Sequence, residues 1–218
     1  MKRLELTVLC VCAMLFTLLA LTLAHRHGAP YALDRTAHAW SLHHRPGLLK
    51  DLARAVTATG TGPVPYLCAL AAGFIAGHSQ GMRGRLLASA AALGFLVAGQ
   101  ALRYGVLHVI GRPRPPVPDW AAPASGYAFP SGHTTTAALA AGLLAWALLR
   151  TLRPARARVA VVLLTCWAIA VGASRVYLGV HWATDVLGGW LFALTLLALG
   201  TVLIHRKENT PHPTAPLA

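Results

Sequence analysis

The chain has 218 residues, of which 56% are hydrophobic and only 11% are charged. A soluble domain carries about 25% charged residues, so this composition argues against a cytosolic protein and for one domain embedded in a membrane. Basic residues dominate, with 19 Lys and Arg against 6 Asp and Glu, which suits an anionic lipid or substrate. They are scattered between apolar runs rather than gathered in one stripe, so a nucleic-acid partner is not expected.

Apolar runs of the length that a membrane-spanning helix needs, about 20 residues, recur along the chain. They cover residues 6–24, 63–77, 86–110, 132–149, 159–177 and 182–204, the second being short. We therefore predict an all-α bundle of six transmembrane helices. Lys2 and Arg3 precede the first run, as in a signal peptide. That run exceeds the roughly 7–15 residues of a signal-peptide core and no small-residue cleavage site follows, so we expect an uncleaved anchor.

The longest connection, residues 25–62, contains one amphipathic stretch. Its apolar side is formed by Leu48, Leu49, Leu52 and Val56. An interfacial helix at the headgroup level and an ordinary capping helix both fit this pattern. Residues 1–62 then form a first helix with its outer loop, residues 63–205 a core of five transmembrane helices, and residues 206–218 a cytoplasmic tail. Three prolines near the end of that tail favour disorder.

Lys and Arg in short loops predict the orientation of the bundle. With the N-terminus inside, ten of them fall in inner segments and eight in outer ones. Three of the outer eight belong to the motifs described below, where chemistry can explain them. We therefore expect a multi-pass protein of the cell membrane with both termini cytoplasmic and the polar motifs on the extracytoplasmic face.

The first polar motif, Gly-Arg-Pro-Arg-Pro-Pro over residues 111–116, follows the third apolar run. Arg112 and Arg114 each carry a planar guanidinium whose donors fit phosphate oxygens. The prolines restrict the backbone that carries these two side chains. A basic, proline-rich loop is common, so this motif alone is weak evidence for a site.

The second motif, Pro-Ser-Gly-His over residues 130–133, opens the fourth apolar run. A helix N-terminus binds anions through free N–H groups and a partial positive charge. Ser131 adds a hydroxyl donor, Gly132 lets an anion approach the backbone, and His133 is placed to give a proton to a leaving oxygen. Serine is also common at helix caps without any function, so this motif alone is again weak.

The third motif joins Ser174 and Arg175 to His181 and Asp185. His181 and Asp185 are four residues apart, so on a helix they share one face. The carboxylate can keep one ring nitrogen protonated and leave the other free as a nucleophile. Gly179 allows a turn between the fifth and sixth runs. A buried histidine that bonds an aspartate for structural reasons would look the same in isolation.

All three motifs fall on the same predicted side of the membrane, where ionisable residues are costly and usually functional. Together they supply arginines, a helix N-terminus and two histidines, one of them backed by a carboxylate. An anion cradle, a nucleophile and a general acid are the parts needed for phosphoryl transfer without a metal.

These motifs resemble those of the type 2 phosphatidic acid phosphatase superfamily, which also includes the vanadium haloperoxidases. Its pattern is Lys-x6-Arg-Pro, then Pro-Ser-Gly-His, then Ser-Arg-x5-His-x3-Asp. The second and third blocks match completely, and Arg114-Pro115 takes the Arg-Pro position. The resemblance covers roughly residues 85–200 and agrees with the six-span layout.

The first block is incomplete, because Leu107 stands where the family has lysine. Arg103 lies one helical turn earlier on roughly the same face, whereas the adjacent His108 points about 100° away. Arg103 could replace the missing cation, or it could extend its side chain to the outer headgroups.

The resemblance implies a role for each matched residue. His181 attacks phosphorus and becomes phosphohistidine, Asp185 orients it, and His133 protonates the leaving group and then activates water. The phosphoryl oxygens are held by Arg114, Arg175, Ser131 and the Gly132 backbone, with Arg112 and Arg103 as further candidates. No metal and no cofactor is implied.

The expected function is hydrolysis of a lipid-linked phosphate or pyrophosphate, such as undecaprenyl pyrophosphate, phosphatidylglycerol phosphate or phosphatidic acid. A catalytically weak relative that binds lipid or scaffolds a complex is an alternative, supported only by Leu107. A vanadate-dependent haloperoxidase fits less well, because the superfamily members with that activity are soluble proteins and this chain is expected to span a membrane. The sequence indicates neither the lipid nor an oligomeric state.

Overall fold

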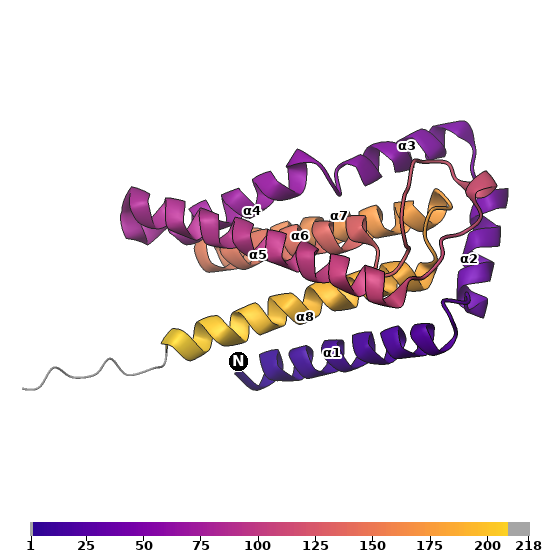
Figure 1. The fold of residues 1–218 in the computed structure, drawn as a ribbon. Helices are drawn as coiled ribbons and strands as arrows, with labels where there is room; N and C mark the ends of the chain where they lie inside the picture. Colours follow the sequence, from indigo (N-terminus) through magenta and orange to yellow (C-terminus); the bar gives the residue numbers. More distant parts are fainter. Residues whose placement is uncertain (1, 209–218) are drawn as a thin grey trace, which may run out of the picture.

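A computed structural model describes residues 2–208, which form a helical bundle without strands (Figure 1). The helices are α1 (Lys2–His25), α2 (Ala32–His43), α3 (Gly47–Ala58), α4 (Pro63–Ala76), α5 (Gly81–Ile110), α6 (Gly132–Thr151), α7 (Pro154–Tyr177) and α8 (Ala183–Glu208). Two short 3-10 helices, His78–Gln80 and Val117–Asp119, lie in the connections. The disordered tail expected at residues 209–218 lies outside the described residues.

Five of the described helices, α1, α5, α6, α7 and α8, are long and apolar enough to cross a membrane. A sixth span exists if α3 and α4, which meet at 44°, cross the membrane together as one broken span. Helix α4 has 14 residues, which at about 1.5 Å each is too short for about 30 Å of hydrocarbon. Gly62, with φ of 63°, and Pro63 make the break between the two helices. The prediction of an all-α transmembrane bundle is confirmed, with five spans in single helices and the sixth formed only if α3 and α4 act as one broken span.

Helix α6 is central in the bundle, and α1 lies along α8 (Figure 1). Leu96, Leu139, Ala140 and Ala193 form a buried apolar cluster among α5, α6 and α8. Small residues permit close approach of the helices: a Cβ at Gly73 of α4 would lie 2.3 Å from the Ser89 backbone of α5. Such small-residue contacts are the usual basis of helix association in membranes, where burial of apolar surface gives no driving force.

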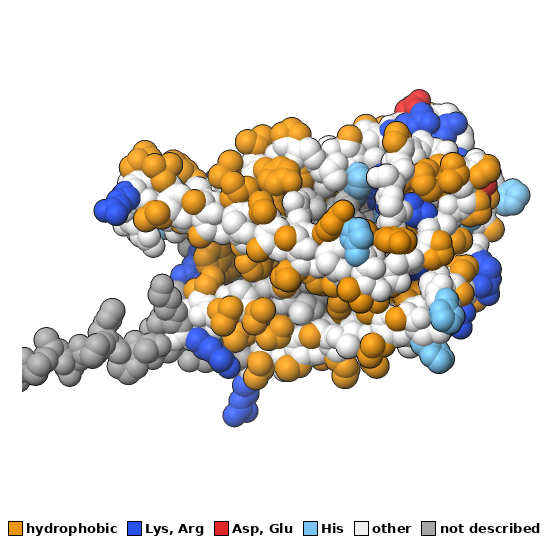
Figure 2. Space-filling view, in the orientation of Figure 1, with side chains coloured by type: hydrophobic (Ala, Val, Ile, Leu, Met, Phe, Trp, Pro, Cys, Tyr) orange, Lys and Arg blue, Asp and Glu red, His pale blue; other side chains and the backbone are white. Residues whose placement is uncertain are grey.

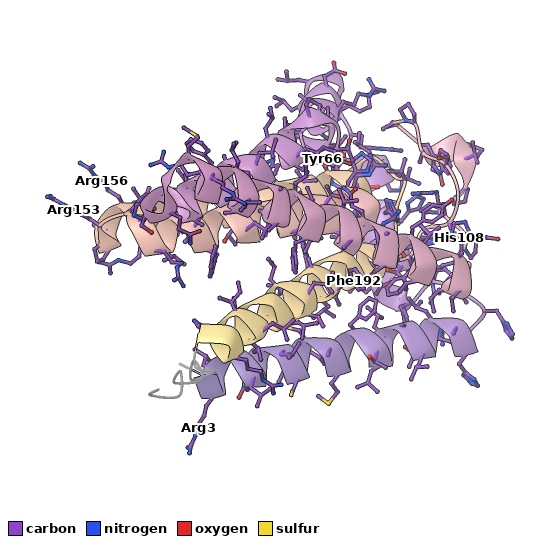
Figure 3. All side chains as sticks on the ribbon, turned by 60° about the vertical axis from the view of Figure 1, so that its left-hand side comes forward. Arg3, Tyr66, His108, Arg153, Arg156 and Phe192 are labelled. Atoms are coloured by element: carbon purple, nitrogen blue, oxygen red, sulfur yellow. The ribbon has the colours of Figure 1, made fainter. Side chains whose placement is uncertain are left out.

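A chain of hydrogen bonds also joins α4, α5 and α6. The Tyr66 hydroxyl donates to Gln100 Oε1 at 3.0 Å, and Gln100 Nε2 donates to the Thr136 hydroxyl at 3.2 Å. Gln100 interrupts the third apolar run, and this chain explains how a polar side chain is accommodated inside the bundle. Tyr66 is labelled in Figure 3.

Helix α2 was not expected, because residues 25–62 carry only one amphipathic stretch. The Tyr31 N–H donates to Asp34 Oδ2 at 3.0 Å, so the carboxylate caps the first turn of α2. Helix α3 coincides with the expected amphipathic stretch. Its Leu48 and Leu52 are 74% and 53% exposed, so the apolar side faces away from the bundle, as a lipid-contacting helix requires and a capping helix does not.

The two ends of the bundle differ. The start of α1, the end of α8 and the α4–α5 and α6–α7 connections lie at one end, whereas α2, α3 and the 111–131 loop lie at the other (Figure 1). Blue Lys and Arg side chains gather at the ends, and the visible middle is mostly hydrophobic (Figure 2). Arg3, Arg153 and Arg156 lie at the end opposite His108 (Figure 3).

Candidate active site

Backbone hydrogen bonds bring the three polar motifs together at the end that carries α2 and α3. Ser131 N–H donates to the Asp185 carbonyl at 3.1 Å, which joins the start of α6 to the start of α8. The Ala128 N–H donates to the Arg112 carbonyl at 2.8 Å, which holds the first motif against the second. Gly179, with φ of 73°, makes the expected turn between α7 and α8.

His181 is buried between a carboxylate and a guanidinium. Its Nδ1 lies 3.3 Å from Asp185 Oδ2, and its Nε2 lies 2.8 Å from Arg114 NH1. Arginine can only donate, so Nε2 must accept and the ring proton belongs on Nδ1, beside the carboxylate. This tautomer places the lone pair on Nε2, which could attack phosphorus once a bound phosphoryl group takes the place of Arg114 at that nitrogen.

The charge state of His181 follows from its surroundings. Burial, followed by the positive charges of Arg114, Arg175 and Arg103, holds the pKa of His181 well below its usual range. The imidazole is therefore neutral at physiological pH, as a nucleophile must be. Burial also lowers the pKa of Arg114, while Asp185 raises it and Arg103 lowers it.

Arg114 and Arg175 both lie near His181, and they are held in different ways. Arg114 donates through NH1 to the Val180 carbonyl at 2.8 Å and through Nε to the Gly126 carbonyl at 3.0 Å. Arg175 is buried, and its NH1 donates to the Thr57 hydroxyl at 3.1 Å. The Nε of Arg175 is buried without a hydrogen-bond partner among the described residues. A buried, unpaired donor is costly, so this nitrogen suits an oxygen of a bound anion.

Ser131 precedes the first turn of α6, as expected of a cap. Its hydroxyl oxygen accepts from the Thr134 hydroxyl at 3.0 Å. At Gly132, an added Cβ would lie 3.3 Å from the guanidinium carbon of Arg103. Glycine therefore gives room for this guanidinium at the helix start, a contact that we did not anticipate from the motif.

Arg103 reaches the same helix start from α5. Its NH1 donates to the Pro130 carbonyl at 3.3 Å, directly before the Ser-Gly-His motif. Leu107, at the family's lysine position, is buried, and His108 is exposed with its ring 4.2 Å from that of Tyr104. Of the basic residues near the end of α5, Arg103 therefore contacts the start of α6, whereas the His108 side chain is exposed and points away from the site.

His133 faces the break between α3 and α4. Its Nε2 lies 3.4 Å from the hydroxyl of Thr61. Thr57 binds Arg175 from the same segment, so two threonines from residues 57–61 contact site residues. These two threonines were missed because hydroxyl residues near a Gly-rich break carry no distinctive pattern; the only signal was polarity beside a short span.

Arg112 takes a position different from the expected phosphate contact. It is fully buried, and its nitrogens bond the Gly28 carbonyl, the Thr184 hydroxyl and the carboxylates of Asp34 and Asp185. With these partners on Nε, NH1 and NH2, the guanidinium holds protein oxygens rather than facing an anion site. The Pro113 that follows predicted a restricted backbone at Arg112 but not the direction of its side chain.

Within residues 2–208, no group of three or more His, Cys, Asp or Glu side chains is placed to hold a metal ion. The arrangement combines a neutral histidine oriented by a carboxylate, a second histidine and three arginines around a helix N-terminus. Such a set can bind a phosphoryl group and stabilise the charge that develops on it.

Sequence comparison identifies the family of this chain and related proteins. Residues 86–209 match the model of the PAP2 superfamily. Phosphatidylglycerophosphatase B of Escherichia coli K12 is 40% identical over 84 residues, 38% of this chain and 31% of that protein. The Bacillus subtilis 168 protein of the same name is 40% identical over 77 residues, 34% of this chain and 38% of that protein. The matched regions thus span about a third of the length of these relatives.

A solved structure supports the fold. The crystal structure of a transmembrane PAP2 type phosphatidylglycerolphosphate phosphatase from Bacillus subtilis superposes with a TM-score of 0.72 at 24% identity. The superposition covers 93% of this chain and 97% of that one, so it extends well into the region of α1 to α4, which lies outside the family match. The chain belongs to the PAP2 superfamily.

Proposed function

We propose that this protein is a membrane phosphatase that hydrolyses a lipid-linked phosphate or pyrophosphate through a phosphohistidine intermediate. The observation that carries the proposal is the pairing of His181, with Asp185 at Nδ1 and Arg114 at Nε2. This arrangement orients the lone pair of Nε2 toward a group that binds anions. The family match and the names of the relatives support the same reaction class.

In the proposed reaction, the phosphoryl group binds among Arg114, Arg175 and Arg103 at the start of α6. His181 Nε2 forms a bond to phosphorus while the bond from phosphorus to the leaving oxygen breaks, and His133 supplies a proton to that oxygen. Water then attacks phosphorus, His133 takes up its proton, and the bond to His181 breaks. Phosphate is released and free His181 is regenerated.

The substrate class follows from the position of the site in the bundle. The site lies at one end of a set of membrane-spanning helices, where a lipid headgroup can enter while its chains stay in the bilayer. Phosphatidylglycerol phosphate is the first candidate, because two relatives are named for it. Undecaprenyl pyrophosphate and phosphatidic acid are further candidates, because each also ends in a phosphate group.

The test is phosphate release by the purified full chain from these three lipids, with and without a chelator of divalent metals. We expect release from at least one lipid at a rate that the chelator does not change. Failure to release phosphate from any of them would favour the lipid-binding alternative. Loss of activity on chelation would contradict the metal-independent mechanism.

Arg103 is expected to replace the family lysine. Arg103→Ala should lower turnover on the order of 10²-fold, as for loss of one preorganised charge-stabilising donor. Leu107→Lys in that variant should restore part of the rate. The matched control is Arg83→Ala, which removes an exposed arginine at the other end of α5. Wild-type turnover in a folded Arg103→Ala protein would show that Arg103 only reaches toward headgroups.

We further propose that the site faces the extracytoplasmic side and that both termini are cytoplasmic. The support is the basic loops at the opposite end of the bundle. In a variant lacking the native cysteines, Val117→Cys lies near the site and Ser79→Cys lies at the other end, and both positions are exposed. An impermeant thiol reagent should label Val117→Cys in intact cells and Ser79→Cys only after lysis. The reverse pattern would invert the topology.

A further inference from the structure

A buried network of charges lies behind the nucleophile, away from the proposed phosphate cradle. It consists of Asp34 from α2, Arg112 from the first motif, and Thr184 and Asp185 from the start of α8. Asp34, Arg112 and Asp185 are each 0% exposed, and Thr184 is 6% exposed. Asp34 lies in the segment that carries no family motif and precedes the family match.

Arg112 sits between two carboxylates. Its NH2 donates to Asp34 Oδ2 at 2.7 Å, and its NH1 donates to Asp185 Oδ1 and, at 2.7 Å, to the Thr184 hydroxyl. One positive and two negative groups therefore share an enclosed space, which leaves one net negative charge beside His181. Inside a protein, such a charge acts far more strongly than it would in water.

Each oxygen of Asp185 has its own partner. Oδ1 faces Arg112, while Oδ2 accepts from the Trp182 N–H at 2.8 Å and lies 3.3 Å from His181 Nδ1. The plane of the carboxylate is thus fixed by Arg112 on one side and by the backbone on the other. This fixed plane sets the direction in which His181 is held.

Asp34 has two effects on this arrangement. Its Oδ1 accepts from the Thr184 N–H at 2.8 Å, which anchors the first turn of α8 to α2. Its charge also divides the attraction of Arg112 between two carboxylates. If Asp34 were neutral, Arg112 would be balanced by Asp185 alone, and the network would have no net charge with which to stabilise a positive imidazole.

We infer that Asp34 is a positioning residue for catalysis: by balancing the positive charge of Arg112, it leaves the negative charge of Asp185 uncompensated on the side of His181. The need arises when His181 Nε2 bonds phosphorus and the leaving oxygen departs, because the ring, still protonated at Nδ1, then becomes positive. This inference rests on the proposed phosphohistidine mechanism. It assigns a function to α2, a helix outside the family motifs.

The test compares Asp34→Asn with the double variant Asp34→Asn/Arg112→Gln. Asparagine keeps the size and one acceptor oxygen but removes the charge. We expect Asp34→Asn to lower kcat about 10-fold to 100-fold, the range seen when a partner that orients a ligand residue is lost, with KM little changed. The double variant restores one net negative charge, on Asp185, so its kcat should rise above that of Asp34→Asn.

Controls separate this charge effect from folding. Asp51→Asn removes an exposed carboxylate that pairs with Arg54 on α3, and its kcat should match the wild type. Thermal unfolding in detergent identifies variants that are unfolded at the assay temperature. If Asp34→Asn is unfolded, the test rests on the double variant alone. The inference predicts that the kcat of the double variant lies within about tenfold of the wild-type value.

The outcomes are distinguishable. A wild-type protein that releases no phosphate from any lipid would overturn the proposed function itself. An active wild type with unchanged kcat in a folded Asp34→Asn protein would overturn only the role of Asp34. A double variant slower than Asp34→Asn would show that the network serves structure alone and would also overturn the inference.

Discussion

Replacing His181 with alanine is expected to lower turnover by at least about 10⁴-fold, as for loss of the nucleophile in other enzymes that form a covalent intermediate. The physical reason is that no other described side chain combines burial, a carboxylate at one ring nitrogen and a guanidinium at the other. The measurement is phosphate release under saturating lipid. Binding of inorganic phosphate should survive, because the arginines remain.

The matched control is His108→Ala. His108 is a histidine at the same end of the bundle, but it is exposed and its Nδ1 bonds the Tyr104 carbonyl of its own helix at 2.9 Å. We expect the turnover of the His108→Ala protein to equal that of the wild type. Near-normal turnover in a folded His181→Ala protein would rule out the proposed nucleophile.

The second large effect is expected for His133→Ala, and its size should depend on the leaving group. A general acid contributes about 10²–10⁴-fold, most when the leaving oxygen is strongly basic. His133 lies at the start of α6, where a bound phosphoryl group would present its leaving oxygen. The full loss is therefore expected with an alkyl phosphate and a much smaller one with an aryl phosphate.

The comparison between the two substrates makes this prediction specific. Thr61→Val removes the hydroxyl 3.4 Å from His133 Nε2 and keeps the side-chain shape. It should reproduce a weaker form of the same leaving-group dependence if Thr61 orients the ring. An equal loss on alkyl and aryl phosphates in His133→Ala would mean that His133 only helps to bind phosphate.

Much of the fold could be predicted, because the requirement for long apolar helices is imposed by the thickness of the bilayer. The ends of the spans near Ile110, Gly132 and Tyr177 agree with the structure, since polar motifs or glycine mark them. Helix α2 and the 44° break after α3 could not be predicted. Helix α2 carries no periodic apolar pattern, and the local cap from Asp34 is too weak a signal to reveal it alone. Gly62 and Pro63 mark a break but do not give its angle.

The residues of the candidate site also fall into those that the sequence could identify and those that it could not. His133, His181 and Asp185 could be identified because their spacing is distinctive in an apolar chain. Arg103 could be suggested from helix geometry, and the structure places its guanidinium beside Gly132. The direction of Arg112 could not be read from the sequence, because it depends on Asp34, which is 78 residues away along the chain.

The central claim is that His181 carries the phosphoryl group during turnover. The most direct measurement is rapid mixing of the purified protein with a lipid labelled in its terminal phosphate, followed by quenching in alkali and peptide mapping. We predict transient labelling that is stable to alkali, labile to acid and confined to the peptide that contains His181. Steady phosphate release without any labelled protein, or a label on another residue, would contradict the account.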